Sequence, residues 1–190
     1  NKISRYYQFT PCSQHLILMQ KRHKNKPQYF EEQAITTQKF VVPFIADLIK
    51  FDSKTTVLEI GCAEAGNLKP FLDMGCKCTG IDISCSRIEL AKEFYKGHVN
   101  RQNLTLICKD IYNVNPDKKY DVIIMRDVIE HIPNQERFME LVKAFLKPGG
   151  IFFLAFPPWQ NPFGGHQQIC RGKLLSKLPW FHLFPRGFYK

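Results

Sequence analysis

Long apolar stretches are missing from this sequence. The longest fully apolar run extends from Ile151 to Phe156 and ends at two prolines, far short of the roughly 20 residues that a membrane-spanning helix needs. The first residues, Asn1 to Phe9, are polar and aromatic and lack the apolar stretch of a secretory signal. We therefore predict a cytoplasmic protein with no transmembrane segment.

Paired C-x-x-C spacings are also absent, although the chain has seven cysteines. A cysteine-based metal site normally needs such pairs. Five cysteines fall in or beside apparent core strands and turns. We expect these five to be reduced and mostly buried thiols: Cys62, Cys76, Cys78, Cys85 and Cys108.

Acidic residues are missing from both ends of the chain. The net charge is +10, and residues 1–30 carry six Lys and Arg while residues 167–190 carry five, with no acid in either segment. The middle of the chain is therefore close to neutral. Basic ends suit an anionic substrate, a membrane surface or nucleic acid, unless they are simply solvated tails.

Short apolar runs alternate with helical patterns along the middle of the chain. The runs are continuously apolar, as expected for parallel strands covered by helices on both faces. Strand, helix and strand in steady succession predict a doubly wound, mostly parallel α/β sheet of the Rossmann-like kind. The expected strands are Thr55–Ile60, Cys76–Ile81, Leu104–Cys108, Asp121–Met125 and Ile151–Phe156.

Helical patterns fill the connections between these strands. Residues 35–50 carry one in which Pro43 indicates a kink or a late start, and residues 67–74 carry another. A third helix begins at Ser84 or Ser86, and Ser86 has capping-box spacing to Glu89. The last, with an apolar stripe over 138–146, is closed by the Lys-Pro-Gly-Gly of 147–150.

The regular alternation stops after Phe156, where proline and glycine punctuate an aromatic, basic stretch. We divide the chain into a basic N-terminal segment (1–34), a ligand-binding α/β domain (35–158) and a loop with a basic C-terminal segment (159–190). A sheet that ends with the fifth strand has an open edge, which is a pairing liability. We therefore expect that the natural protein continues past Lys190 or that the C-terminal segment covers this edge.

The residues that end the strands carry the chemistry, because open α/β sheets bind ligands at the carboxyl ends of their strands. After the first strand, small residues at 61, 63, 65 and 66 permit a tight turn and a close approach of the backbone to a ligand. The second strand ends at Asp82, about 20 residues on, where an acid can hold ribose hydroxyls. The third ends at Asp110, and Arg126 follows the fourth.

The glycine loop alone does not identify the ligand. Residues 61–66 also fit a loose G-x-A-x-x-G dinucleotide fingerprint, and Asp82 suits a nicotinamide cofactor equally well. Glu59 separates the two interpretations, because its carboxylate would repel a pyrophosphate and attract the ammonium group of an amino-acid ligand. Asp110 adds an acid suited to the exocyclic amine of adenine.

Taken together, these segments resemble the class I S-adenosylmethionine-dependent methyltransferases. The matching stretches are VLEIGCAEAGNL (57–68), GIDIS (80–84), Asp110, DVIIMRDVIEHIP (121–133) and LKPGGIFFLAFPP (146–158). The resemblance implies S-adenosyl-L-methionine as cofactor. It also implies roles for ten residues: a pocket shaped by Glu59, Gly61, Cys62, Ala63 and Gly66, ribose contacts from Asp82 and its neighbour Ile83, adenine contacts from Asp110 and Ile111, and a methionine contact from Arg126.

The sequence departs from the family in two places. The family loop is usually richer in glycine than this one, which has Ala63 and Ala65, and alanine does not readily adopt a positive φ angle. The family sheet also has two further strands after the fifth, which this chain does not show. The alanines keep open a non-catalytic relative that binds a partner through its basic ends.

A second cluster follows the fourth strand. Asp127, Glu130 and His131 resemble the acid-x-x-Glu-His cluster of ubiquinone-biosynthesis O-methyltransferases, where such residues have been tied to a divalent metal. Glu-His at this place is widespread in related methyltransferases, so we predict no metal site from it. His131 is equally well a capping histidine.

The acceptor side is predicted to involve the loop from Trp159 to His166, because aromatics and a histidine on a Gly/Pro loop suit a pocket or lid. His166 is the preferred general base and His131 the second candidate. We expect a small-molecule, sugar or lipid-linked acceptor, anionic and methylated at a hydroxyl, rather than a nucleic acid. A nicotinamide-dependent oxidoreductase is the alternative enzyme class. The sequence determines neither the acceptor nor the oligomeric state.

Overall fold

The computed structural model describes residues 25–156, 178–180 and 183. The chain divides into two compact units, and the helices and strands described below belong to the unit of residues 22–158. Of the second unit, residues 1–21 and 159–190, the structure describes only a short turn in which the Leu183 N–H donates to the Trp180 carbonyl at 3.0 Å. No helix in the described part of the chain is both long and apolar enough to cross a bilayer.

Five parallel strands form one sheet in the order β3-β2-β1-β4-β5. Their bounds are β1 Thr56–Ile60, β2 Lys77–Asp82, β3 Leu104–Cys108, β4 Tyr120–Arg126 and β5 Leu146–Ala155. The chain proceeds outward from β1 first to one side, through β2 and β3, and then to the other, through β4 and β5. This reversal at β1 confirms the predicted doubly wound fold, and it places the carboxyl end of β1 where such sheets bind ligands.

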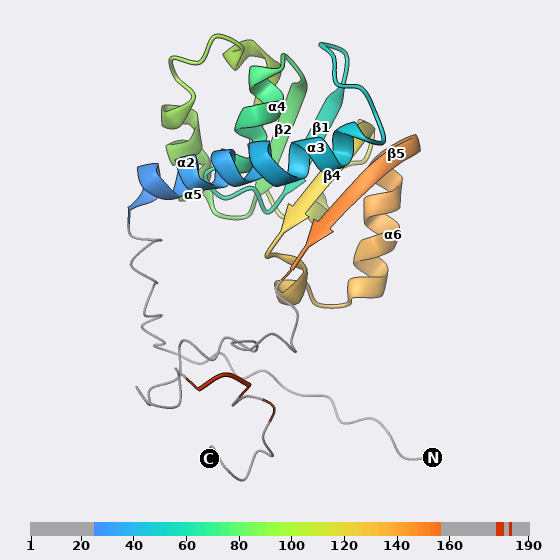
Figure 1. Cartoon of the computed structure of the whole chain (residues 1–190). Coiled ribbons are helices and arrows are strands. Elements are labelled where there is room, and N and C mark those ends of the chain that lie inside the picture. The colour runs from blue at the N-terminus through green and yellow to red at the C-terminus, as the bar shows by residue number, and fades with distance from the viewer. Residues whose placement is uncertain (1–24, 157–177, 181–182, 184–190) are drawn as a thin grey trace, which may run out of the picture. The chain divides into compact units, whose positions relative to one another are not determined.

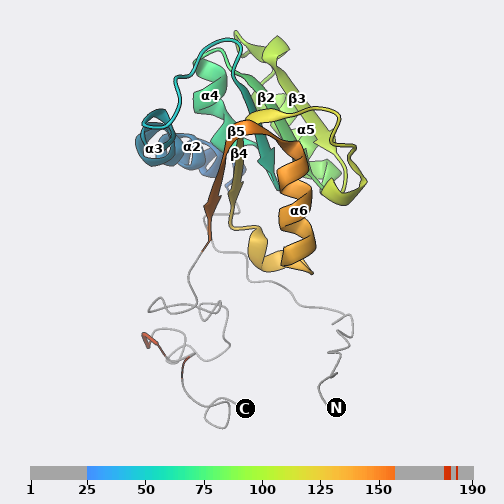
Figure 2. The ribbon, with the colours of Figure 1, turned by 90° about the vertical axis from the view of Figure 1, so that its right-hand side faces the viewer.

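Helices cover both faces of the sheet unequally (Figures 1 and 2). One face carries four helices and a π-helical turn: α2 (Lys26–Thr36), η1 (Thr37–Val41), α3 (Val42–Ala46), α4 (Lys69–Asp73) and α5 (Cys85–Phe94). The other carries α6 (Gln135–Phe145), whose Phe138, Val142 and Phe145 are buried against the strands. The connection between β3 and β4 has only the short 3-10 turn η4 (Ile111–Asn113).

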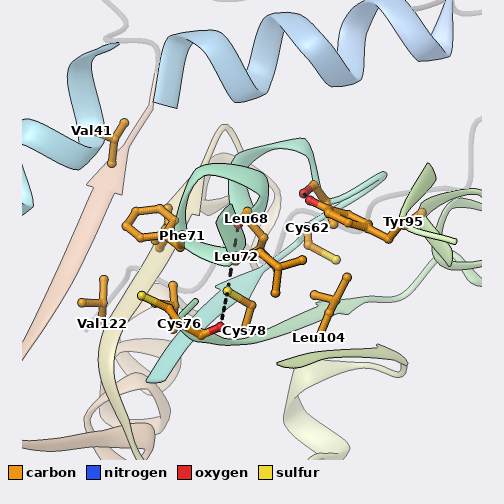
Figure 3. Close-up of a cluster of buried hydrophobic side chains, with 14 of the residues drawn as sticks. Val41, Cys62, Leu68, Phe71, Leu72, Cys76, Cys78, Tyr95, Leu104 and Val122 are labelled. Atoms are coloured by element: carbon orange, nitrogen blue, oxygen red, sulfur yellow. Dashed lines mark hydrogen bonds between the residues drawn. The ribbon is translucent and has the colours of Figure 1, made fainter. Parts of the chain in front are cut away.

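Figure 3 shows the core under the four-helix face, where Cys62, Cys76 and Cys78 are packed among apolar side chains. The Cys78 thiol lies 4.0 Å from the Leu68 carbonyl oxygen and 3.8 Å from that of Cys76. Burial raises the pKa of the Cys62 and Cys78 thiols well above the usual value. These three cysteines are therefore free, buried and protonated, as expected.

The expectation of reduced thiols is wrong for Cys85 and Cys108, which form a disulfide. Cys85 is the first residue of α5 and Cys108 the last of β3, and the parallel register of β2 with β3 pairs Asp82 with Cys108. This pairing brings the two Cα atoms within 5.0 Å, a separation that suits a disulfide. Neither cysteine is buried, so the bridge lies at the surface.

Helix boundaries differ from the sequence patterns at two points. The first helix begins at Lys26 rather than near residue 35. Its N-cap residue is Asn25, whose side chain accepts a hydrogen bond from the Gln28 N–H. Pro43 does not break the helical backbone, because it lies in α3 directly after the π-helical turn η1. Phe44 and Leu48, which belong to the expected apolar face, are exposed. Ser84, not Ser86, occupies the N-cap position of α5, so the predicted capping box does not form.

The fifth strand also begins earlier than predicted. Leu146 already pairs with Tyr120, and a register shift between Tyr120 and Val122 accommodates the Pro-Gly-Gly of 148–150 that we interpreted as a turn. Within the described residues β5 pairs only with β4, so it forms an edge of the sheet.

Candidate functional site

The loop after β1 takes the backbone path of a glycine-rich ligand loop. Gly61 has φ +72°, and a Cβ at this position would lie 2.5 Å from Cγ2 of Val128. Ala63 and Ala65 have φ angles of 50° and 61°, in the left-handed region. The expectation that alanine would not adopt a positive φ is thus wrong: surrounding contacts impose the conformation, at a cost of about 1–2 kcal/mol for each residue. The buried Ala65, for example, is held by a 2.7 Å bond from Tyr95 Oη to its carbonyl.

Replacing Ala63 by glycine should therefore stabilise the protein. Glycine removes the Cβ penalty at φ 50°, and we expect a gain of about 1 kcal/mol, or roughly 2–4 °C in the midpoint of thermal unfolding. Ala91→Gly is the matched control, because Ala91 is buried inside α5 and glycine there should destabilise by about 1 kcal/mol. A lower melting temperature for Ala63→Gly would contradict the strain argument.

Asp82, the last residue of β2, ties its strand to this loop. Its Oδ2 accepts the Ala63 N–H and its Oδ1 accepts the Ser84 N–H, both at 2.8 Å. The side chain is nearly buried, with 9% exposed. Asp82 is thus brought to the β1 loop as predicted, although its carboxylate already has a structural role in holding that loop.

Four residues from separate elements meet at the carboxyl end of β1. Asn67 Nδ2 donates to Oε1 of Glu59 at 2.6 Å, and Asn67 Oδ1 accepts from Thr37 Oγ1 at 2.9 Å and from Arg126 Nη1 at 2.8 Å. Arg126 Nη1 also lies 3.1 Å from Thr37 Oγ1. The structure therefore brings Glu59 and Arg126 together, with Asn67 between them.

The Glu59 carboxyl is almost completely enclosed, with 1% of the residue exposed. Its Oε2 atom is buried and has no hydrogen-bond partner among the described residues. Burial raises the pKa of Glu59 to about 8 and the charge of Asp82 adds to this, while the Asn67 hydrogen bond and the Arg126 charge oppose it. A buried acceptor left unsatisfied costs about 1–3 kcal/mol, which a cationic ligand would recover.

Helix α2 packs directly on the loop. A Cβ on Gly66 would lie 2.6 Å from the Phe30 carbonyl oxygen, so only glycine permits this approach. Glu64, 1% exposed, forms an ion pair with Lys26, whose Nζ lies 2.6 Å from Oε1. A buried Gln33 oxygen on α2 also lacks a hydrogen-bond partner within the described part of the chain.

The predicted adenine residues lie after β3, at the start of the 3-10 turn η4. Asp110 caps η4 by accepting the Tyr112 N–H at 3.0 Å, and Ile111 is buried beside it. Ile83, which follows Asp82, is 74% exposed. An apolar side chain so exposed next to the loop is available to contact a ligand.

Asp127, Glu130 and His131 lie in and around the 3-10 turn η5 (Ile129–His131) and are exposed. Asp127 has φ 54°, and its N–H donates to the Ala155 carbonyl at 2.9 Å. Among residues 25–156, 178–180 and 183, no three His, Cys, Asp or Glu side chains are grouped to hold a metal ion. His166 and the loop from Trp159 lie outside the described residues.

Sequence patterns did not identify Asn67, Thr37, Glu64 or Lys26. Asn67 had a weak signal, because it follows Gly66 at the point where a helix was expected to begin. Thr37 lies 30 residues earlier in the chain, and only the packing of α2 and η1 on the loop places it beside Asn67. Tertiary structure alone assembles this group.

Comparison with known proteins agrees with the fold. A family model described as a methyltransferase domain matches residues 30–183. The ubiquinone biosynthesis O-methyltransferase of Bradyrhizobium sp. (strain ORS 278) is 31% identical over 100 residues, which are 52% of this chain and 38% of that protein. The protein of the same name from Coxiella burnetii (strain RSA 493 / Nine Mile phase I) is 31% identical over 102 residues, 52% of this chain and 42% of its own length. The chain thus spans about two fifths of the length of these curated relatives.

Solved structures share the fold. Coclaurine N-methyltransferase bound to N-methylheliamine and S-adenosylhomocysteine superposes with a TM-score of 0.55 at 21% identity, over 64% of this chain and 35% of that one. The glycopeptide N-methyltransferase MtfA complexed with S-adenosylmethionine gives 0.53 at 22% identity, over 62% and 48%.

Proposed function

Because the chain belongs to the methyltransferase domain family, we propose that it is an S-adenosylmethionine-dependent methyltransferase acting on a small-molecule, sugar or lipid-linked acceptor at a hydroxyl group. The observation that carries the cofactor assignment is the buried Oε2 of Glu59, which has no partner in the described structure. The ammonium group of a methionine moiety would be stabilised by the ionised carboxyl, whereas a pyrophosphate at this position would oppose that ionisation and form no ion pair.

The residues at the carboxyl edge fit the parts of this cofactor. Asp82, with Ile83 beside it, would hold the ribose hydroxyls, Asp110 and Ile111 would flank the adenine, and Arg126 would lie beside the methionine part. Gly61, Cys62, Ala63 and Gly66 form the wall of the pocket. When bound, the cofactor supplies an electrophilic methyl group on a sulfonium sulfur.

The protein's contribution to catalysis is to orient the acceptor toward that methyl group and to exclude water. A hydroxyl acceptor also needs a base. We assign this role to His166, with His131, at the end of η5, as the second candidate. The basic ends favour an anionic acceptor and are suited to contact with a membrane surface. We retain a cytoplasmic location as part of this proposal.

Calorimetry with S-adenosylhomocysteine and, separately, with NADH tests the assignment. We expect a one-to-one complex with S-adenosylhomocysteine and no heat of binding with NADH. The reverse result would favour the oxidoreductase, and binding of neither would favour a non-catalytic relative. A metabolite screen with a labelled methyl donor then identifies the acceptor, on which the turnover of His166→Ala tests the proposed base.

A further inference from the structure

The Glu59 carboxyl is a buried acid whose hydrogen-bonding capacity the described structure satisfies only in part. It is enclosed at the point where the strand order reverses, one oxygen is hydrogen-bonded to Asn67, and the other has no hydrogen-bond partner in the described structure. A half-satisfied buried acid is costly, so this arrangement indicates a ligand that completes it.

Asn67 can adopt only one orientation in this network. Its Oδ1 accepts from two donors, the Thr37 hydroxyl and the Arg126 guanidinium. Reversing the amide would place an NH₂ group against the guanidinium and deprive both donors of their acceptor. The donor side of Asn67 is therefore fixed toward Oε1 of Glu59, which leaves Oε2 for the ligand. Thr37 is held in place by the π-helical turn η1, a feature that often occurs at functional sites.

We propose that Asn67 is a positioning residue that presents the second oxygen of Glu59 to the ammonium group of the cofactor, and that binding expels a proton from Glu59. The inference rests on the proposed function. In this step the O–H bond of the neutral carboxyl breaks, the proton passes to the buffer, and the carboxylate forms an ion pair with the ammonium group, which stays protonated.

The charges around Glu59 determine the sign of this coupling. Arg126 on β4 favours the carboxylate and Asp82 on β2 disfavours it. The remaining titratable neighbours are neutral at pH 7, because burial raises the pKa of each: Cys62 in the loop, Cys78 on β2 and Tyr95 at the end of α5. Lys26 is paired with Glu64.

Without ligand, the carboxyl has a pKa of about 8 because of burial, so it is mostly neutral at pH 7. A positive charge at Oε2 lowers that pKa. Proton release therefore accompanies binding at any pH between the bound and the free pKa. Over that range, affinity should rise about tenfold for each pH unit and become constant above pH 8.

Calorimetry of S-adenosylhomocysteine binding at pH 7, in phosphate and in Tris, measures the protons exchanged. For the unmodified protein we expect the release of about 0.9 proton. Glu59→Gln retains the shape and the Asn67 bond, so it should release none of these protons and its affinity should vary little between pH 6 and 8. Asn67→Leu should still release a proton but shift the pH at which affinity becomes constant upward, because the carboxylate loses its donor. A purely structural role for Asn67 would lower affinity without moving that pH.

The matched control is Asn103→Leu. It removes an amide that donates to the Gly75 carbonyl near the amino ends of β2 and β3, away from the carboxyl ends where Glu59 lies. It should leave proton release unchanged. Binding by the unmodified protein without proton release would overturn this inference and leave the proposed function intact. Failure to bind S-adenosylhomocysteine at all would overturn the proposed function, and the inference with it. The measurement on the unmodified protein tests the proton release even where a variant fails to fold.

Discussion

Asp82→Ala should weaken the binding of S-adenosylhomocysteine by at least about a hundredfold. If both ribose hydroxyls donate to this carboxylate, the variant loses two charge-assisted hydrogen bonds, each of roughly 1.5–3 kcal/mol, and about 1.4 kcal/mol is a factor of ten in affinity. Calorimetric titration measures the change. An unchanged dissociation constant would remove Asp82 from the site.

A second effect of this substitution has to be separated from the first. Asp82 also accepts the Ala63 and Ser84 N–H groups, so alanine releases the loop as well as the ribose. The 2′-deoxy analogue of the ligand distinguishes the two effects: the unmodified protein should bind it more weakly than S-adenosylhomocysteine, whereas Asp82→Ala should bind both equally. Asp117→Ala, an exposed acid before β4, makes the same change of charge and should leave both affinities unaltered.

The sheet could be predicted from the sequence because its strands are short, continuously apolar runs with clear ends. Four of the five expected strands agree with the structure to within one residue at each end. The start of β5 could not be predicted in this way, because Pro148 and the two glycines after it are typical of a turn. In the structure they lie in a strand at the edge of the sheet, where proline is tolerated.

The candidate site could be predicted only as far as it depends on strand ends. Glu59 and Asp82 were expected near the loop because parallel strands bring their carboxyl ends to one edge. The contacts of Asn67 with Thr37 and Arg126 join residues 30 and 59 positions apart, and no local pattern encodes them. The positive φ angles of Ala63 and Ala65 were missed for a similar reason, since tertiary contacts overcame the local preference.

The disulfide could not be predicted because its cysteines share no motif. They are 23 residues apart, and only the knowledge that β2 and β3 are neighbours places them together. The presence of this disulfide also bears on the predicted cytoplasmic location. Disulfides rarely persist in a reducing cytosol, so such a location would require the bridge to be transient.

Reducing the Cys85–Cys108 bridge should destabilise the protein by about 3 kcal/mol. In the chain-entropy account, a cross-link that closes a loop of this size lowers the entropy of the unfolded chain and so raises its free energy by about that much. For a chain of this length the loss corresponds to a fall of roughly 6–12 °C in the midpoint of thermal unfolding.

Differential scanning calorimetry with and without dithiothreitol measures this fall, after mass spectrometry of the alkylated, unfolded chain has shown that the bridge was present. The double variant Cys85→Ser, Cys108→Ser should melt at the lower temperature in both conditions, because it lacks the bridge that dithiothreitol reduces. Ligand affinity should change much less than stability, since the β2–β3 ladder and the bond from the Lys109 N–H to the Asp82 carbonyl hold the two strand ends together without the bridge. Equal melting temperatures for the bridged and reduced protein would show that the bridge does not contribute to stability.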